Sequence, residues 1–180
     1  MPDGNLAKGF IGAAKRLIPA SAKRPTQGSL RRAISTSYYA VFHALAKMAA
    51  DSLVGVVKAK RSDKAWVEVY RGLTHGHCKT ACEGAKNIRF PEELHDFSDA
   101  FMQLQEAPHL VDYDPIIRVK KEDALFYISL AERSIQALKN TGMLDRRAFA
   151  TWVLITSQGA KNARQRAKVS NSRVIPRQGA

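Results

Sequence analysis

Two short segments of the chain place an arginine six residues before a histidine, a pairing that could support chemistry on an RNA phosphodiester. They are YRGLTHGHC, with Arg71 and His77, and RFPEELH, with Arg89 and His95; His75 lies inside the first. An arginine can hold a phosphate through charge-assisted hydrogen bonds, and a histidine can move a proton near neutral pH. Arg71, His75 and His77 are therefore candidate catalytic residues of a metal-independent ribonuclease. The spacing alone is weak support, because residues six apart do not share a helix face and such pairs also arise by chance.

The same region could place three metal-ligating side chains on one side of a helix. His75, Cys78 and Cys82 are separated by three and four residues, and imidazole with thiolate suits zinc. A structural zinc site normally has four ligands, however, and no second pair of such residues occurs elsewhere in the chain. We therefore predict two half-buried cysteines, with no metal and no other cofactor.

The segment from Ser29 to Gly55 carries a tyrosine pair and a histidine within an otherwise apolar pattern. Tyr39 and His43 are one helical turn apart and can touch, whereas Tyr38 points roughly 100° away, into the apolar stripe. A histidine on an apolar helix is more often a hydrogen-bonded core residue than a catalyst. We therefore expect His43 to be the hydrogen-bonded partner of Tyr39.

Two arginine doublets stand where helices are expected to begin: Arg31 with Arg32, and Arg146 with Arg147. A cation at a helix N-terminus opposes the helix dipole, so local helix stability does not explain them. Contact with the phosphates of a nucleic acid would explain the doublets, and so would salt bridges to the acidic segment 91–114. The sequence leaves these two explanations open, and all four arginines are candidate nucleic-acid-binding residues.

Charge is the most unusual feature of the composition. The chain has 29 Lys and Arg against 16 Asp and Glu, a formal net charge of +13. Residues 1–90 carry a net +11, residues 91–114 a net −7 with no Lys or Arg, and residues 115–180 a net +9. Such a balance favours an anionic partner, nucleic acid first and an acidic protein or an anionic membrane surface next, although high charge can also serve only to keep copies of a protein apart.

The expected subcellular location follows from features that the sequence lacks. There are only two cysteines, which agrees with a reducing compartment, and the N-terminus does not read as a secretory signal. No uncharged apolar run approaches the length that spans a bilayer. We expect a cytoplasmic protein with no membrane contact.

The elements that must position these residues are helices, because apolar residues recur at three- and four-residue steps and no strand-like alternation is present. The expected helices cover residues 5–18, 29–55, 63–87, 91–107, 121–140 and 143–156. Prolines are expected to end two of them, at Pro19 and Pro108, and the long segment 29–55 is expected to be the spine of the bundle.

This pattern predicts that the chain is divided into three parts. Residues 1–28 form a short helix and linker, residues 29–156 form the bundle, and residues 157–180 form a basic tail that we expect to be disordered in isolation. The fold class predicted is all-α: a bundle of four to five main helices with a short extra C-terminal helix.

Two stretches resemble the HEPN-domain family. RRAISTSYYAVFHALAKMAADSLVG is similar to the first long helix of these proteins, and LQEAPHLVDYDP followed by YISLAERSIQAL resembles their Asp-Tyr turn and closing helix. The motif residues in this chain are Tyr38, Tyr39, His43, Asp112 and Tyr113. The resemblance implies a HEPN-like helical bundle that often dimerises and acts in RNA processing, toxin–antitoxin pairs or defence.

Three functions follow as hypotheses. The first is a HEPN-like homodimer that binds RNA or an RNA-linked partner through its basic faces. The second is a metal-independent ribonuclease. Because no histidine follows His109, the family's Arg-x(4–6)-His motif is not at its usual C-terminal place; Arg71 with His75 or His77 is the candidate pair, and His43 is the remaining alternative. The third is a protein-interaction role, as an adaptor or antitoxin without catalysis.

Overall fold

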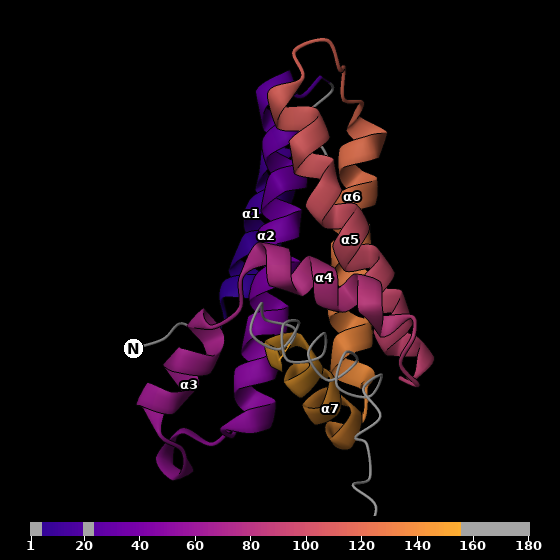
Figure 1. The fold of residues 1–180 in the computed structure, drawn as a ribbon. Coiled ribbons are helices and arrows are strands. Elements are labelled where there is room, and N and C mark those ends of the chain that lie inside the picture. The colour runs from indigo at the N-terminus through magenta and orange to yellow at the C-terminus, as the bar shows by residue number, and fades with distance from the viewer. Residues whose placement is uncertain (1–4, 20–23, 156–180) are drawn as a thin grey trace, which may run out of the picture.

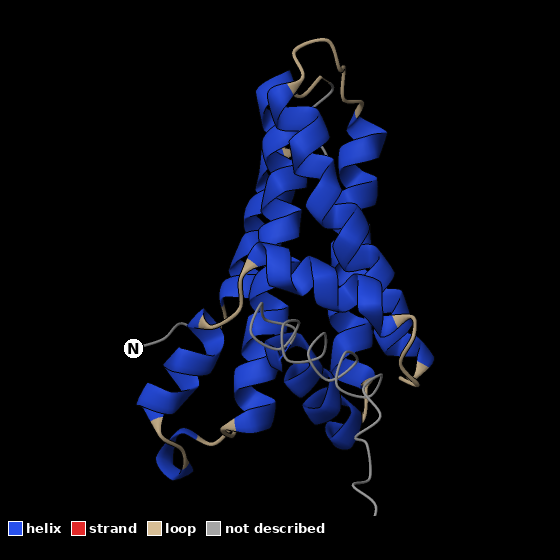
Figure 2. Cartoon of the chain, viewed as in Figure 1, coloured by secondary structure: helices blue, strands red, loops and turns tan. Residues whose placement is uncertain are grey.

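The fold is that of a computed structural model, which describes residues 5–19 and 24–155. Within these ranges the chain forms only helices and the loops that join them, which confirms the predicted all-α class (Figure 2). The helices are α1 (Leu6–Leu17), α2 (Gln27–Leu53), a short 3-10 helix η1 (Lys58–Lys60), α3 (Asp63–Arg71), α4 (His75–Ala85), α5 (Glu92–Tyr113), α6 (Lys121–Asn140) and α7 (Met143–Ile155). The predicted basic tail and part of the predicted linker lie outside the described residues.

Four helices run side by side along the long axis of the molecule: α1, α2, α5 and α6 (Figure 1). Helix α4 lies across this bundle, while α3 and α7 pack at one end of it. None of the helices in the described ranges is both long and apolar enough to cross a membrane.

Helix α2 is the spine, as its length predicted. It packs against α1, α3, α5, α6 and α7, and more than half of its 27 residues are buried. It begins at Gln27, two residues before the expected start, and its N-cap is Thr26: the Thr26 hydroxyl accepts a hydrogen bond from the Ser29 backbone N–H at 3.1 Å. Its C-terminal side agrees with the prediction, because Gly55 follows the cap with φ of 125°, where a glycine is favoured.

The buried side chains form two clusters that share α2. The larger one lies toward α4 and α7 and contains the biggest fully buried rings, Phe97, Phe101 and Phe149. The smaller one joins α1, α2, α5 and α6, and it includes Ala14, Ile18 and Ile34. Helix α1 therefore packs on the bundle through its own apolar stripe.

The predicted helix over residues 63–87 is two helices. Helix α3 ends before Gly72, and α4 begins after Thr74, whose hydroxyl accepts from the His77 backbone N–H at 3.4 Å. Glycine weakens a helix and threonine is a good N-cap, so the break falls where both are available. Because of it, His75 becomes the first residue of a new helix.

The prediction that Pro108 ends its helix was wrong: α5 continues to Tyr113. Pro108 gives up one backbone hydrogen bond, but Leu104, Ala107 and Val111 around it are buried against neighbouring helices. This burial outweighs the local cost of the proline. Asp112 and Tyr113 consequently lie in the last turn of α5 and not in a separate turn.

Candidate nucleic-acid interface

Aromatic and histidine side chains from four helices meet on one side of α2. We call this cluster the aromatic–histidine face; it consists of Phe10 from α1, Tyr38, Tyr39, Phe42 and His43 from α2, Tyr70 from α3 and His75 from α4. Tyr39 is 39% exposed, and most of the other rings are partly exposed, so the face is reachable from solvent.

The first histidine of the face is held by a tyrosine and stacked on a phenylalanine. The Tyr38 hydroxyl and His75 Nδ1 share a hydrogen bond, and the Phe42 and His75 rings stack with centroids 4.0 Å apart. Burial raises the pKa of Tyr38, which keeps its hydroxyl protonated. His75 therefore has a fixed ring orientation, with Nε2 left to contact a ligand.

The second histidine bonds across helices, and not within α2 as predicted. His43 Nδ1 shares a hydrogen bond of 2.7 Å with the Tyr70 hydroxyl, and its ring stacks on Phe10 at 5.0 Å. Tyr39, the predicted partner, instead packs its ring beside Phe10 and Tyr38. The expected contact fails because α3 brings a tyrosine to His43 that spacing along α2 could not reveal.

Both imidazoles of the face are neutral at neutral pH. Burial lowers the pKa of His43 and of His75 below the ordinary 6.5, and the neighbouring His75 lowers that of His43 further. A neutral imidazole can stack on a base and can accept a proton, whereas it contributes no charge to phosphate binding.

These lowered pKa values predict that the protein loses stability as the pH falls. The unfolded chain takes up a proton on each histidine more readily than the folded chain does. The contribution of each histidine to stability is therefore fully present when the pH is above 6.5, its ordinary pKa, and is lost as the pH falls through its lowered pKa. We expect the free energy of unfolding, measured by urea denaturation, to fall steadily from about pH 7.5 to about pH 5. The double variant His43→Gln/His75→Gln should flatten this dependence; a slope equal to that of the original protein would contradict the assignment.

The structure brings one of the three candidate catalytic residues into this face. His75 belongs to it, while His77 lies two positions further along α4 and so points to the other side of that helix. Arg71 follows Tyr70 at the end of α3; it is exposed, and among the described residues it has no hydrogen bond or ion pair.

The first arginine doublet divides into two different roles. The Arg31 guanidinium donates to three backbone carbonyls at and just beyond the C-terminal end of α5, those of Val111, Asp114 and Ile117, the last two at 3.1 and 2.7 Å. Arg31 thus satisfies carbonyls that a helix end leaves without partners, a role that the sequence did not suggest. Arg32 is exposed, and it lies two turns before Tyr39 on the same face of α2.

The second doublet lies elsewhere, beside a cavity between α2, α6 and α7. Both arginines line the cavity, and Arg147 Nε also donates to the Ser52 carbonyl at 3.2 Å. Neither belongs to the aromatic–histidine face.

The remaining motif residues are placed at the far end of α5. The Ser35 hydroxyl donates to Asp112 Oδ2 at 2.6 Å, which ties this end of α5 to α2. Tyr113 is 80% exposed, with its ring beside that of His109.

Both cysteines are core residues. Cys78 and Cys82 are fully buried, rather than half-buried as predicted, and burial raises the pKa of Cys78 and brings that of Cys82 to about 12. Their thiols therefore stay protonated. Across residues 5–19 and 24–155, no three His, Cys, Asp or Glu side chains are grouped so that they could hold a metal ion.

Three members of the face were missed by the sequence reasoning: Phe10, Phe42 and Tyr70. Each lies on or beside an apolar stripe, where an aromatic ring is expected in the core. The signal that could have found them is the pairing of Tyr70 with His43, which requires knowing that α3 folds back on α2.

The fold and this face define a class: an all-helical bundle that presents aromatic rings and neutral imidazoles on one side of its central helix. No protein-family model matches the chain, and neither the curated proteins nor the solved structures contain a match.

Proposed function

We propose that this protein is a HEPN-like helical bundle that binds single-stranded RNA on the aromatic–histidine face. The observation that carries the proposal is the set of partly exposed rings from α1, α2 and α4 gathered on one surface. Unpaired bases stack on such rings, and each stacked base contributes about 1–3 kcal/mol. Two exposed arginines, Arg32 and Arg71, belong to the helices of this face and can hold the phosphates between stacked bases.

Charge and resemblance give additional support. The net charge of +13 attracts a polyanion over a long range, and it predicts affinity that falls as salt rises. The family motif residues Tyr38, Tyr39 and His43 all lie in the face. The same resemblance supports a homodimer, which light scattering of the purified protein would test.

RNA binding should depend on the face and not on basic charge in general. We expect Tyr39→Ala to weaken binding of a short unstructured RNA about tenfold, because one stacking platform is lost. Arg32→Ala should weaken binding and lower the slope of log affinity against log salt by about one, the result of losing one phosphate contact. Fluorescence anisotropy of a labelled oligonucleotide at several salt concentrations measures both.

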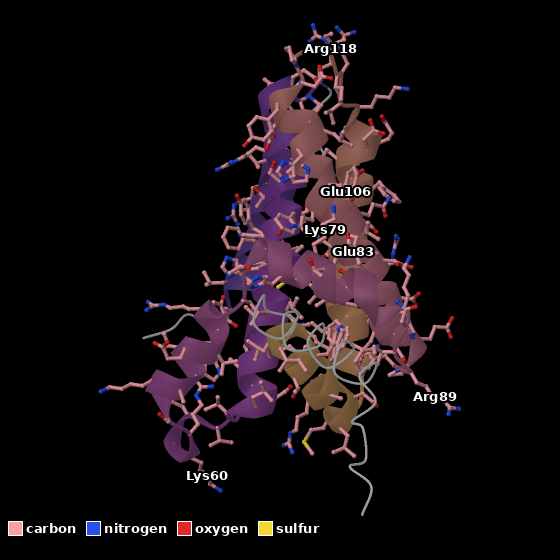
Figure 3. The ribbon with its side chains drawn as sticks, viewed as in Figure 1. Lys60, Lys79, Glu83, Arg89, Glu106 and Arg118 are labelled. Atoms are coloured by element: carbon pink, nitrogen blue, oxygen red, sulfur yellow. The ribbon has the colours of Figure 1, made fainter. Side chains whose placement is uncertain are left out.

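Arg89 provides the matched control. It is an exposed arginine on the α4–α5 connection, away from α1 and α3 (Figure 3). Arg89→Ala removes the same charge, so equal losses in Arg89→Ala and Arg32→Ala would mean that RNA binds to the charged surface at large and would overturn the assigned face. Absence of RNA binding at low salt would overturn the function itself.

A metal-independent ribonuclease is the second candidate function, and the two oriented imidazoles favour it. Each has Nδ1 bonded to a tyrosine and a lowered pKa; with Nδ1–H donating to the tyrosine oxygen, Nε2 carries no proton and can accept one from an RNA 2′-hydroxyl. Cleavage of RNA in the presence of a chelator, abolished in His75→Ala and retained in His77→Ala, is the expected result. Cleavage that survives in His75→Ala would rule this site out.

A further inference from the structure

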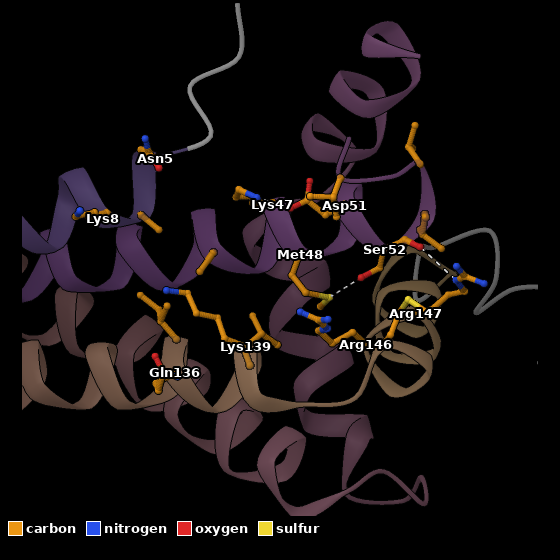
Figure 4. Close-up of a pocket in the computed structure, with 18 of the residues that line it drawn as sticks. Asn5, Lys8, Lys47, Met48, Asp51, Ser52, Gln136, Lys139, Arg146 and Arg147 are labelled. Carbon is orange, nitrogen blue, oxygen red and sulfur yellow. Dashed lines mark hydrogen bonds and ion pairs between the residues drawn. The ribbon is translucent and has the colours of Figure 1, made fainter. Parts of the chain in front are cut away.

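A cavity of about 950 Å³ lies between α1, the C-terminal half of α2, α6 and the start of α7 (Figure 4). This volume is typical of sites for small molecules. The cavity lies apart from the aromatic–histidine face, because none of the residues of that face lines it.

The apolar part of the cavity is aliphatic. Its side chains are Ala7, Ile11, Ala44, Met48, Leu53, Val54, Val56, Ile135, Leu138 and Met143. Met48 and Leu138 are buried at its base, whereas Leu53, Val56 and Met143 are 38%, 68% and 62% exposed. Large apolar side chains exposed together mark a surface that a ligand or partner covers. None of the described residues that line the cavity is aromatic, so they offer a nucleobase no stacking partner.

The polar part of the cavity is cationic. Six basic side chains line it: Lys8, Lys47, Arg133, Lys139, Arg146 and Arg147. The lining acids are Asp51 and Glu132, so the lining carries a net charge of +4 (six cations less two anions). Glu132 is already paired with Lys15 at 2.6 Å, outside the cavity, and Asp51 is paired with both Lys47 and Arg61.

Among these cations, Arg146 has a buried hydrogen-bond donor that is unsatisfied. Its Nε is buried and has no hydrogen-bond partner, and Figure 4 places its guanidinium beneath Met48, inside the cavity. Among the described residues, Lys8 and Lys139 likewise have no hydrogen bond or ion pair, and Lys139 reaches from α6 toward α2. Because a buried N–H of a charged group is normally satisfied, the Nε of Arg146 suits a negatively charged acceptor, and the exposed ammonium groups of Lys8 and Lys139 add positive charge at the same site.

We propose that the cavity binds an anionic amphiphile, a molecule with an aliphatic chain and a carboxylate or phosphate head. The head accepts hydrogen bonds from Arg146 and Lys139, and the chain covers Met48, Leu53 and Met143. An inorganic anion would leave the aliphatic lining exposed, and a nucleotide would find no ring to stack on. This binding is separate from RNA binding, because Arg146 is not part of the aromatic–histidine face.

Calorimetric titration with laurate, kept below its micelle concentration, tests the proposal. We expect one laurate per chain, bound at least tenfold more tightly than inorganic phosphate, which lacks the chain, and than dodecanol, which lacks the charge. Arg146→Met keeps aliphatic bulk and removes the charge, and it should weaken laurate binding at least tenfold. Arg118→Met, at the opposite end of the bundle (Figure 3), is the matched control and should bind laurate as the original protein does.

Folding and ligand source are checked in the same variants. Arg146 Nε has no protein partner to lose, so Arg146→Met should melt at the same temperature as the original protein or higher, and it should bind RNA unchanged. A second experiment measures binding to vesicles that contain an anionic phospholipid. If Arg146→Met weakens binding to laurate, the ligand is a free amphiphile. If it weakens binding to the vesicles but not to laurate, the amphiphile is a lipid in a bilayer. Laurate and vesicle binding that are both unaffected by Arg146→Met, or laurate no tighter than dodecanol, would overturn the proposal.

Discussion

Replacing Arg31 by alanine is expected to lower the free energy of unfolding by about 3 kcal/mol. The side chain is partly buried, and its guanidinium serves the carbonyls of Val111, Asp114 and Ile117. The first of these is in the last turn of α5, where carbonyls have no partner within the helix, and the others lie in the connection to α6. Alanine leaves all three without their donor, and it loosens the end of α5 from α2.

The geometry of the donor matters as much as its charge. A guanidinium presents several N–H groups in a fixed plane, whereas a lysine ammonium is a single compact centre on a flexible stem. Arg31→Lys should therefore recover less than half of the stability lost in Arg31→Ala, as measured by urea denaturation.

The neighbouring arginine is the control for this experiment. Arg32 is exposed, so Arg32→Ala should change the free energy of unfolding by no more than about 0.5 kcal/mol while weakening RNA binding. Two adjacent arginines would then have separate effects, one on stability and one on binding. If Arg31→Ala is as stable as Arg32→Ala, the carbonyl contacts contribute nothing and the structural role of Arg31 is wrong.

The helices themselves could be predicted because each carries its own apolar stripe. The long helix over residues 29–55, the one over 121–140 and the last one all lie within a few residues of their expected places. The errors are at points where packing overrides a local signal. Pro108 would end an isolated helix, but it is tolerated where Ala107 and Val111 are buried. Thr26 caps α2, so the helix begins at Gln27, two residues earlier than the apolar stripe indicated.

The candidate site could be predicted only in pieces. Tyr38 and His75 were both singled out, but as members of separate motifs, because they are 37 positions apart in the sequence. Periodicity describes the faces of one helix, and it does not say which two helices meet. The break at Gly72 and Thr74 turns α4 across the bundle and brings His75 onto the tyrosines of α2. The cationic cavity has the same origin, since its arginines and apolar residues come from four helices.

Asp51 connects the two sites, because it borders the cavity and also holds α3. Its Oδ1 accepts from the buried indole Nε1 of Trp66 at 2.9 Å and pairs with Arg61 at 3.5 Å. Arg61 in turn lies over the Trp66 ring, 4.6 Å from its centroid. Helix α3 carries Tyr70, which orients His43, so the carboxylate of Asp51 supports the aromatic–histidine face from a distance.

Replacing Asp51 by alanine is accordingly expected to lower the free energy of unfolding by about 3 kcal/mol, because a buried indole N–H and a nearly buried guanidinium lose their shared acceptor. Asp99→Ala is the matched control: Asp99 forms an exposed pair with Lys86, so its loss should change stability by less than about 1 kcal/mol. When Asp51→Ala is combined with Trp152→Phe, Trp66 is the remaining tryptophan. As urea rises, its fluorescence emission should shift to the red at a lower urea concentration than the one at which helicity is lost. Coincident transitions would mean that Asp51 does not hold α3 in particular.

The same substitution should move the two proposed binding activities in opposite directions. Asp51→Ala loosens α3 and should weaken RNA binding, yet it removes an anion from the cavity lining and should strengthen laurate binding. Asp51→Asn separates these effects, because its amide oxygen can still accept from Trp66 while its charge is gone. It should strengthen laurate binding and leave RNA binding near that of the original protein. Parallel losses of both activities in Asp51→Asn would instead mean that the two sites are not independent.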